Sequence, residues 1–338
     1  MILCNIYYTS DNNSLPKYKH RYMKKSNIPI TNHLNDFLEY LDIERGLSTK
    51  SQETYQKFLK RFIYWLKDNN LENIKPHELD ENHIRKYRVY LSRTNNKNTK
   101  EPIKRSTQNY HLIALRLFLN YFAYRDIMSL PADKIKLARS KTDERTIKFL
   151  NLDQIKRLLE APKTSTLTGL RDRAILETLF STGLRVAELV SLDRDQIKIK
   201  SDTKDLEIVV IGKGNRPRPV YFSERSIKWI KKYLDTRNDM EKALFINYKG
   251  PKSGPKRLSS RSVESLVKKN AISSGIPIFT SPHTIRHSFA TDLLTKGVDL
   301  RTIQEFLGHK NIGTTQIYAH VTSKKLRDIH RKHHPFKE

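Results

Sequence analysis

Cysteine is almost absent from the 338 residues, with Cys4 as the single example. One cysteine cannot form an internal disulfide or a cysteine-based zinc cluster, so neither is expected to hold this fold together. Long apolar runs are missing too, and the mean hydropathy is −0.66. No run approaches the roughly 20 residues of a membrane-spanning helix, and the N-terminal apolar run, broken by Asn5, makes a poor signal peptide. We expect a cytoplasmic protein.

Positive charge is what the chain has in excess. Lys and Arg number 64 against 36 Asp and Glu, which gives a net charge of +28 and a sequence pI of about 10.0. This excess predicts attraction to a polyanion. Nucleic acid is favoured over a membrane surface because no segment suits insertion into a bilayer.

The pattern along the chain predicts four segments. Residues 1–29 are polar and basic, and we interpret them as a disordered tail, with a DNA-contacting arm as the alternative. Residues 30–125 carry apolar residues at helical spacing, which predicts a small helical bundle. Residues 126–146 contain Pro131 and many charges with little helical period, so we expect a linker. Residues 147–338 form the second domain.

The bundle is predicted to have four amphipathic helices. The first has apolar residues at i, i+3, i+4 and i+7 from Leu34. Thr49 and Gln52 match a T-x-x-Q capping box before the second helix. Residues 81–93 and 106–125 should form the third and fourth. The outer faces are basic, and they are either solvated or in contact with the DNA backbone; they include Lys57, Lys60, Arg61, Arg85, Lys86 and Arg88.

The second domain is expected to combine helices with one small hairpin. Asn151 and Gln154 predict a capped helix start, and residues 171–189 read as a helix interrupted at Thr182 and Gly183. A hairpin is predicted from the strand sequences LEIVVI (206–211) and PVYF (219–222), joined by a GKGN turn. Further helices are expected over residues 224–237, 260–273, 284–296, 299–307 and 322–334. The predicted fold class is therefore mainly α with a small β-sheet.

Neither a metal nor a nucleotide cofactor is expected. The sequence HTIRH lacks the glutamate of the zinc motif H-E-x-x-H. His330, His333 and His334 could bind a metal by spacing alone, but no carboxylate or cysteine set accompanies them. The turn from Gly212 does not match a phosphate-binding G-x-x-x-x-G-K-[ST] loop.

Three separated segments carry residue types that suit phosphodiester cleavage without a metal. Such cleavage needs a nucleophile, positive groups for the phosphorane charge and an acid for the leaving oxygen. Arginine matches two phosphate oxygens with its planar fork, and tyrosine can hold a covalent intermediate. The segments are STGLRVAEL from residue 181, PHTIRH from residue 282, and LGH from residue 307, followed nine residues later by Tyr318.

The motifs TGLRVAEL, GKG, SPHTIRHSFATDLL, LGH and TTQIYAHV occur in the order found in tyrosine site-specific recombinases of the phage integrase family, and the chain resembles that family. The resemblance is closest to the XerC/XerD group. It extends to FLEYLDIERGLSTKSQETY near the start and HRKHHP near the end, over about residues 31–335. It implies a two-domain clamp in which a helical core-binding domain and a catalytic domain enclose duplex DNA.

The resemblance implies a role for each matching residue. Tyr318 is the expected nucleophile, and it alone among the 16 tyrosines falls on the family motif. Arg185 and Arg286 are expected to clamp the scissile phosphate; the alternative for either is a surface ion pair. Lys213 is expected to be the general acid for the 5′-oxygen; the alternative is a solvated turn lysine. Glu188 is expected to support the site geometry.

Two histidines complete the set, and a third falls outside it. His283 is implied in acid–base or phosphate hydrogen-bonding work, and its i, i+3 spacing predicts that it shares a helix face with Arg286. His309 is implied as a donor to a phosphate oxygen. His287 matches no catalytic position and is expected to be structural.

The implied activity is site-specific recombination through a 3′-phosphotyrosyl intermediate and a Holliday junction. The implied partners are double-stranded DNA with an inverted-repeat site and three further copies in a homo-tetramer, with a second recombinase or a DNA translocase as further candidates. The tail over residues 321–334 is expected to dock on a neighbouring subunit or to pack in cis. Xer-like resolution of chromosome or plasmid dimers is the leading role. The alternatives are a mobile-element integrase or excisionase, a type IB topoisomerase-like enzyme and a non-catalytic DNA-binding protein.

Overall fold

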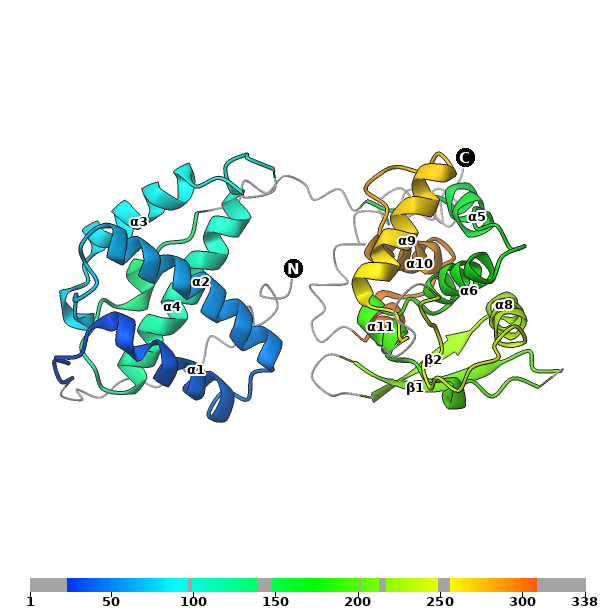
Figure 1. The fold of residues 1–338 in the computed structure, drawn as a ribbon, viewed down its shortest axis with the longest axis horizontal. Helices are drawn as coiled ribbons and strands as arrows, with labels where there is room; N and C mark the ends of the chain where they lie inside the picture. Colours follow the sequence, from blue (N-terminus) through cyan, green and yellow to red (C-terminus); the bar gives the residue numbers. More distant parts are fainter. Residues whose placement is uncertain are drawn as a thin grey trace, which may run out of the picture. The chain divides into compact units, whose positions relative to one another are not determined.

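The computed structural model describes residues 23–96, 99–138, 148–200, 202–212, 217–248 and 256–308. The chain divides into two compact units, Met1–Glu144 and Arg145–Glu338. Figure 1 shows the helices and strands of each unit. The described part is mainly helical with one two-stranded sheet, which confirms the predicted fold class. No described helix is both long and apolar enough to cross a membrane.

The first unit is a helical bundle whose core is rich in aromatic side chains. Phe37 of α1 packs on Phe118 of α4 with ring centroids 5.0 Å apart, and Phe62 of α2 meets Tyr87 of α3 at 4.9 Å. All four rings are buried, so the apolar stripes of the sequence serve packing. The elements are η1 (Ile30–His33), α1 (Leu34–Ile43), α2 (Thr49–Asp68), η2 (Pro76–Glu78), α3 (Glu81–Arg93), α4 (Arg105–Tyr124) and η3 (Ala132–Lys134).

The chain before α1 is tied to the chain after α4. The backbone N–H of Lys24 donates to the carbonyl of Asp126, at 2.8 Å, and the N–H of Met128 donates to the carbonyl of Lys24, at 2.9 Å. The segment that precedes the four helices in the sequence therefore pairs with the segment that follows them.

The two expected helix starts have different outcomes. The T-x-x-Q box at Thr49 is wrong: α2 begins at Thr49, and Ser48 is its N-cap. Gln52 instead donates to the Asp42 carboxylate and the Leu47 carbonyl, both at 2.7 Å, because its side chain reaches back across the turn between α1 and α2. The box at Asn151 is confirmed: its side chain accepts from the N–H of Gln154 at 2.8 Å, and the reverse bond measures 3.0 Å.

The second unit has an apolar core shared by its helices and its hairpin. Helix α6 is its centre and packs against α8, α10, α5 and β2. The expected interruption near Gly183 is confirmed, because α6 ends there and α7 is a separate helix. The elements are α5 (Leu152–Glu160), α6 (Leu167–Thr182), α7 (Val186–Ser191), η4 (Arg194–Gln196), β1 (Leu206–Ile211), β2 (Pro217–Phe222), α8 (Glu224–Leu234), α9 (Ser260–Ser273), α10 (Pro282–Thr295) and α11 (Leu300–Leu307).

The hairpin differs from expectation at its return strand. Strand β2 begins at Pro217, two residues before the predicted start, and pairs antiparallel with β1 from Leu206↔Phe222 to Ile211↔Pro217. Two prolines are tolerated because both strands of a two-stranded sheet are edge strands. The burial pattern alternates, so Arg218, with Val220 and Phe222, faces the protein while Pro217 faces solvent.

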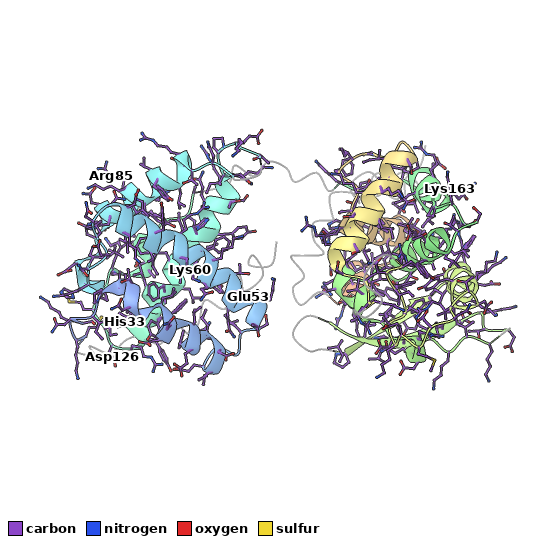
Figure 2. The ribbon with its side chains drawn as sticks, viewed as in Figure 1. His33, Glu53, Lys60, Arg85, Asp126 and Lys163 are labelled. Atoms are coloured by element: carbon purple, nitrogen blue, oxygen red, sulfur yellow. The ribbon has the colours of Figure 1, made fainter. Side chains whose placement is uncertain are left out.

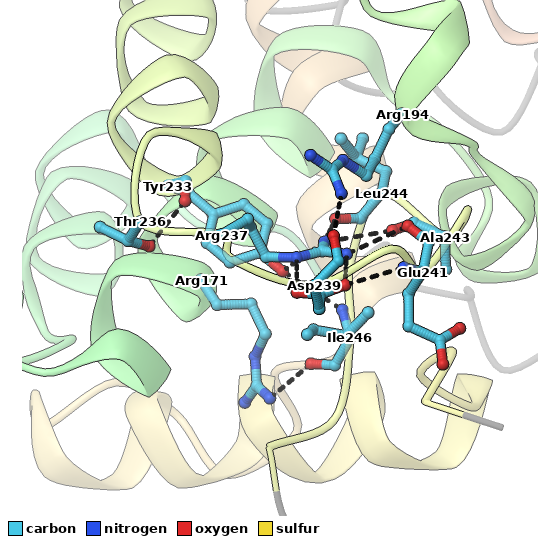
Figure 3. Close-up of polar contacts among 10 residues, drawn as sticks. All are labelled: Arg171, Arg194, Tyr233, Thr236, Arg237, Asp239, Glu241, Ala243, Leu244 and Ile246. Atoms are coloured by element: carbon cyan, nitrogen blue, oxygen red, sulfur yellow. Dashed lines mark hydrogen bonds and ion pairs between the residues drawn. The ribbon is translucent and has the colours of Figure 1, made fainter. Parts of the chain in front are cut away.

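A polar cluster closes the loop after α8 (Figure 3). The guanidinium of Arg237, fully buried, donates to both carboxylate oxygens of Asp239 and to the carbonyl of Leu244 at 2.9 Å. It also reaches the hydroxyl of Tyr233 at 3.2 Å. The partners of Arg237 lie within seven residues of it, so this cluster has a structural role in holding the loop.

Candidate active site of the second unit

Arg185 owes its position to the turn between α6 and α7. Gly183 caps α6 in the left-handed region, at φ +59°, and a Cβ on it would come within 2.7 Å of the Phe289 ring. Only glycine fits both demands. Two residues later, Arg185 occupies the N-cap of α7. The TGLR sequence is therefore a tight turn that leads directly to a basic side chain.

Glu188, one turn into α7, holds Arg185 twice. Its carboxylate accepts from the backbone N–H of Arg185 at 2.8 Å and from the guanidinium at 2.9 Å. The carboxylate is buried, whereas the Arg185 side chain keeps 32% of its surface exposed. Glu188 therefore fixes the base of Arg185 and leaves part of its guanidinium open for a ligand.

Arg286 comes from the start of α10. Ser281 caps this helix, and Pro282 fills its first position, which is the favoured place for proline because its missing N–H is not needed there. The Arg286 guanidinium is buried and donates to the carbonyls of Gly183 and Leu307. It therefore ties the end of α6 to the end of α11.

Arg185 and Arg286 converge on two consecutive peptide groups. Arg286 donates to the Leu307 carbonyl, and Arg185 donates to the Gly308 carbonyl at 3.1 Å. The TGLR turn, the start of α10 and the LGH segment therefore meet at one place. Gly308 allows this because it ends α11 in the left-handed region, at φ +59°.

His283 lies one turn before Arg286 on α10, as its spacing predicts. Its ring meets the ring of His287 edge to face, with centroids 4.3 Å apart. Burial lowers the pKa of His283, and the charges of Arg286 and Arg185 lower it further, although one side of the residue is open to solvent. Burial lowers the pKa of His287 to about 4, with smaller contributions from His283 and Arg286. Both imidazoles are therefore neutral at pH 7.

Three of the expected site residues, Lys213, His309 and Tyr318, lie outside the described residues. The structure describes the chain up to Gly308, and β1 and β2 on either side of the GKGN turn. The described part of the expected site therefore consists of Arg185, Glu188, His283 and Arg286. Among the described residues, no group of three or more His, Cys, Asp or Glu side chains could hold a metal ion.

Arg218 is a member of this cluster that the sequence reasoning missed. It lies on the inward face of β2 and donates to the Glu188 carboxylate at 2.8 Å. In the sequence, the two prolines beside it draw attention as strand breakers and the arginine between them does not. The alternation of the strand, with the arginine in phase with Val220 and Phe222, is the signal that places it inside.

Comparison with known families and proteins shows which family the chain resembles. The family model described as "Phage integrase family" matches residues 148–325, and "Phage integrase, N-terminal SAM-like domain" matches residues 34–126. Tyrosine recombinase XerC of Pelotomaculum thermopropionicum is 35% identical over 316 residues, which cover 90% of this chain and 98% of the relative. Tyrosine recombinase XerD of Listeria monocytogenes is 36% identical over 312 residues, with 89% and 98% covered.

Solved structures share the fold. The XerH site-specific recombinase bound to a palindromic difH substrate has a TM-score of 0.69 and 21% identity, covering 90% of this chain and 97% of that one. The Tn1549 transposon integrase in complex with transposon right-end DNA has a TM-score of 0.67 and 15% identity, covering 90% and 99%. The chain thus belongs to the phage integrase family, and it is a DNA-binding, Xer-like tyrosine recombinase, an enzyme that breaks and rejoins DNA.

Proposed function

We propose that this chain carries out Xer-type strand exchange with Tyr318 as the nucleophile, and that it resolves chromosome or plasmid dimers. The observation that carries the catalytic part is the meeting of Arg185 and Arg286 at the carbonyls of Leu307 and Gly308. These groups lie directly before His309 and ten residues before Tyr318. A nucleophile in this segment would therefore follow, in the sequence, the point at which the two guanidinium groups converge.

The two arginines have different parts in phosphate binding. Arg286 is buried, and its hydrogen bonds to two carbonyls set it in place before DNA arrives. Arg185 is partly exposed and has the freedom to present N–H groups to a phosphate oxygen. Fixed positive groups of this kind stabilise the charge that grows on the phosphorane without reorganisation during the reaction.

The proposed reaction conserves the phosphodiester bond energy. The Tyr318 oxygen attacks the scissile phosphorus, a 3′-phosphotyrosyl bond forms, and the bond to the 5′-oxygen breaks. Lys213 supplies the proton for that oxygen. The free 5′-hydroxyl of a partner strand then attacks the phosphotyrosine, which restores a DNA phosphodiester and frees Tyr318. Neither a nucleotide cofactor nor a metal takes part in these steps.

His283 is proposed to interact with the phosphate as a neutral imidazole. Its pKa is lowered by burial and by Arg286 and Arg185, so at pH 7 one ring nitrogen donates and the other accepts. It can therefore donate to a phosphate oxygen or accept the Tyr318 proton. His309 is proposed as a second donor to the phosphate.

A DNA-bound homo-tetramer on an inverted-repeat site is the proposed assembly, because exchange between two duplexes uses four cleavages. An apolar groove of about 270 Å³ lies at the junction of α6, β2, α10 and α11. Tyr221, Phe289, Leu293 and Phe306 are among its lining residues. We propose that the tail over residues 321–334 of a neighbouring subunit covers it with its apolar positions.

Trapping the covalent intermediate tests the chemistry. The probe is a pool of nicked suicide duplexes made from fragments of the source genome, incubated with the full chain in a chelator. We expect a covalent protein–DNA adduct that is absent with Tyr318→Phe, while Arg237→Lys retains it in proportion to its folded fraction. An adduct that persists in Tyr318→Phe, or a wild-type protein that binds the pool and never cleaves, would overturn the assignment.

The trapped site then tests the biological role. A plasmid dimer that carries two copies of the site should become monomers. A protein that instead joins one end of a mobile element to unrelated target DNA would be a mobile-element integrase. Relaxation of a supercoiled plasmid that lacks the site would indicate topoisomerase activity.

A further inference from the structure

Arg218 is held in the site at a considerable energetic cost. Only 7% of its surface is exposed, and within the described residues its one side-chain hydrogen bond runs from Nη2 to Glu188 at 2.8 Å. Within the described residues, its Nε and Nη1 are buried with no hydrogen-bond partner. Buried donors without partners destabilise a fold by about 1–3 kcal/mol each. A stable hairpin would do better with an apolar residue at this position, so the arginine points to a role other than stability.

Arg218 shares Glu188 with Arg185. One carboxylate oxygen, Oε1, accepts from the Arg185 guanidinium, while Oε2 accepts from Arg218 Nη2 and from the Arg185 backbone N–H. Two guanidinium charges against one carboxylate leave one positive charge on the trio. Without Arg218, the carboxylate would neutralise Arg185 alone, and the positive potential offered to a phosphate would fall.

Arg218 also touches the second anchor of Arg185. A Cβ on Gly308 would come within 2.6 Å of Arg218 Cδ and 2.7 Å of its Nε, so the arginine stem lies directly against the Gly308 backbone. The carbonyl of Gly308 is the group that accepts from Arg185. Arg218 therefore contacts both groups that hold Arg185, Glu188 and Gly308, and it does so from β2.

We propose that Arg218 is a positioning residue: through Glu188 and Gly308 it aligns Arg185, keeps that guanidinium available to the scissile phosphate, and fixes strand β2 next to it. This inference rests on the proposed role of Arg185. It deepens that role by adding a buried arginine that does not touch DNA.

Single-turnover cleavage of the suicide duplex is the first test. Arg218→Met keeps the length of the stem and removes the charge. We expect cleavage to slow about 100-fold while the Kd for DNA changes by less than about 3-fold, because positioning residues act on the transition state more than on binding. Arg218→Lys should recover part of the rate, since it restores the charge without the fork.

The double variant Arg218→Met with Glu188→Gln separates electrostatics from packing. In Arg218→Met, the Glu188 carboxylate should neutralise Arg185. Removing the Glu188 charge as well should then raise the cleavage rate at least about 5-fold above that of Arg218→Met. A purely structural arginine predicts the reverse, because the second change removes further hydrogen bonds. Arg173→Met is the matched control: Arg173 is equally buried and pairs with Glu177, away from the site, so its cleavage should follow its folded fraction.

An NMR readout makes the test independent of catalysis. The guanidinium Nε–Hε signal of Arg185, assigned by its loss in Arg185→Lys, should shift and exchange faster in Arg218→Met and stay unchanged in Arg173→Met. An unchanged Arg185 signal in folded Arg218→Met, or a wild-type cleavage rate, would overturn the inference. If the wild-type protein does not cleave the duplex but the Arg185 signal still shifts in Arg218→Met, the result would count against the proposed function and not against this inference.

Discussion

The guanidinium of Arg185 donates to the carbonyl of Gly308 at 3.1 Å, although 123 residues separate them. This bond joins the turn after α6 to the end of α11, directly before His309. It holds Arg185, the proposed phosphate ligand, against Gly308, ten residues before Tyr318 in the sequence. Changes at either end should therefore alter catalysis as well as stability.

Gly308→Ala should disturb the site more than an ordinary left-handed glycine does. The new methyl group would lie 2.6 Å from Arg218 Cδ, so the Arg218 side chain or the end of α11 must shift. We expect a loss of about 2–4 kcal/mol in the free energy of unfolding and at least a 10-fold slower cleavage by the folded fraction. Urea unfolding and single-turnover cleavage measure the two effects.

Gly46→Ala is the control for that variant. Gly46 has a similar φ, +55°, with no atom within 4 Å of an added Cβ. It should lose only about 1 kcal/mol and cleave at the wild-type rate. Equal effects at both positions would contradict the close contact with Arg218.

Lysine in place of Arg185 or Arg286, the two proposed phosphate ligands, should give two different outcomes. Arg185→Lys should slow cleavage about 100- to 1,000-fold with little change in stability, because the side chain is partly exposed and its proposed role is to donate to phosphate. Arg286→Lys should slow cleavage similarly and also destabilise the fold by about 1–3 kcal/mol, because lysine lacks the two-nitrogen fork that donates to the carbonyls of both Gly183 and Leu307. Thermal unfolding measured beside the cleavage assay separates the effect on stability from the effect on catalysis. Equal stability of the two variants would be evidence against the two buried hydrogen bonds of Arg286.

Stability should fall with acid below pH 6.5. Burial lowers the pKa of His111 to about 4, with Arg61 contributing, and burial also lowers the pKa of His287 to about 4. Between pH 6.5 and 4 the unfolded chain binds protons that the folded chain does not, so stability rises with pH there and is flat above it. For His111 alone the loss amounts to roughly 3 kcal/mol at pH 4.

Urea midpoints at pH 7, 5.5 and 4.5 check this dependence. His111→Leu removes the group that resists protonation, so its midpoint should fall less between pH 7 and 4.5 than that of the wild type. The same acid sensitivity in the variant would show that His111 is not held neutral by burial.

DNA binding should depend on the basic faces of α2 and α3. Lys60 and Arg85 are exposed (labelled in Figure 2), and neither takes part in an ion pair within the described residues. If each neutralises one phosphate, alanine at either position should reduce the slope of log Kd against log salt by about 0.9. Lys50→Ala is the control, because Lys50 already pairs with Glu53 at 3.1 Å. Slopes that stay at the wild-type value for Lys60→Ala and Arg85→Ala would exclude those faces from phosphate contact.

Local signals in the sequence predicted much of the fold. The period of the apolar residues located the long helices, and α3 and α9 span the predicted residues 81–93 and 260–273. These predictions succeed because helix periodicity and capping depend on residues three or four apart. The T-x-x-Q box failed because Gln52 had a better partner across the turn, in Asp42 and Leu47. A four-residue capping pattern does not include hydrogen-bond acceptors that lie outside it, such as Asp42 and Leu47.

The sequence by itself determined the candidates for the site: Arg185, Glu188, His283 and Arg286 stand in motifs whose order and residue types predict a phosphate site. Only the tertiary structure decided how they are held. It brought the ends of α6 and α11 together under Arg286, gave Glu188 two arginines, and set Arg218 against Gly308. The physical reason is that burial and pairing depend on distances through space. Residues about 100 positions apart in the sequence come close only when the core packs around them.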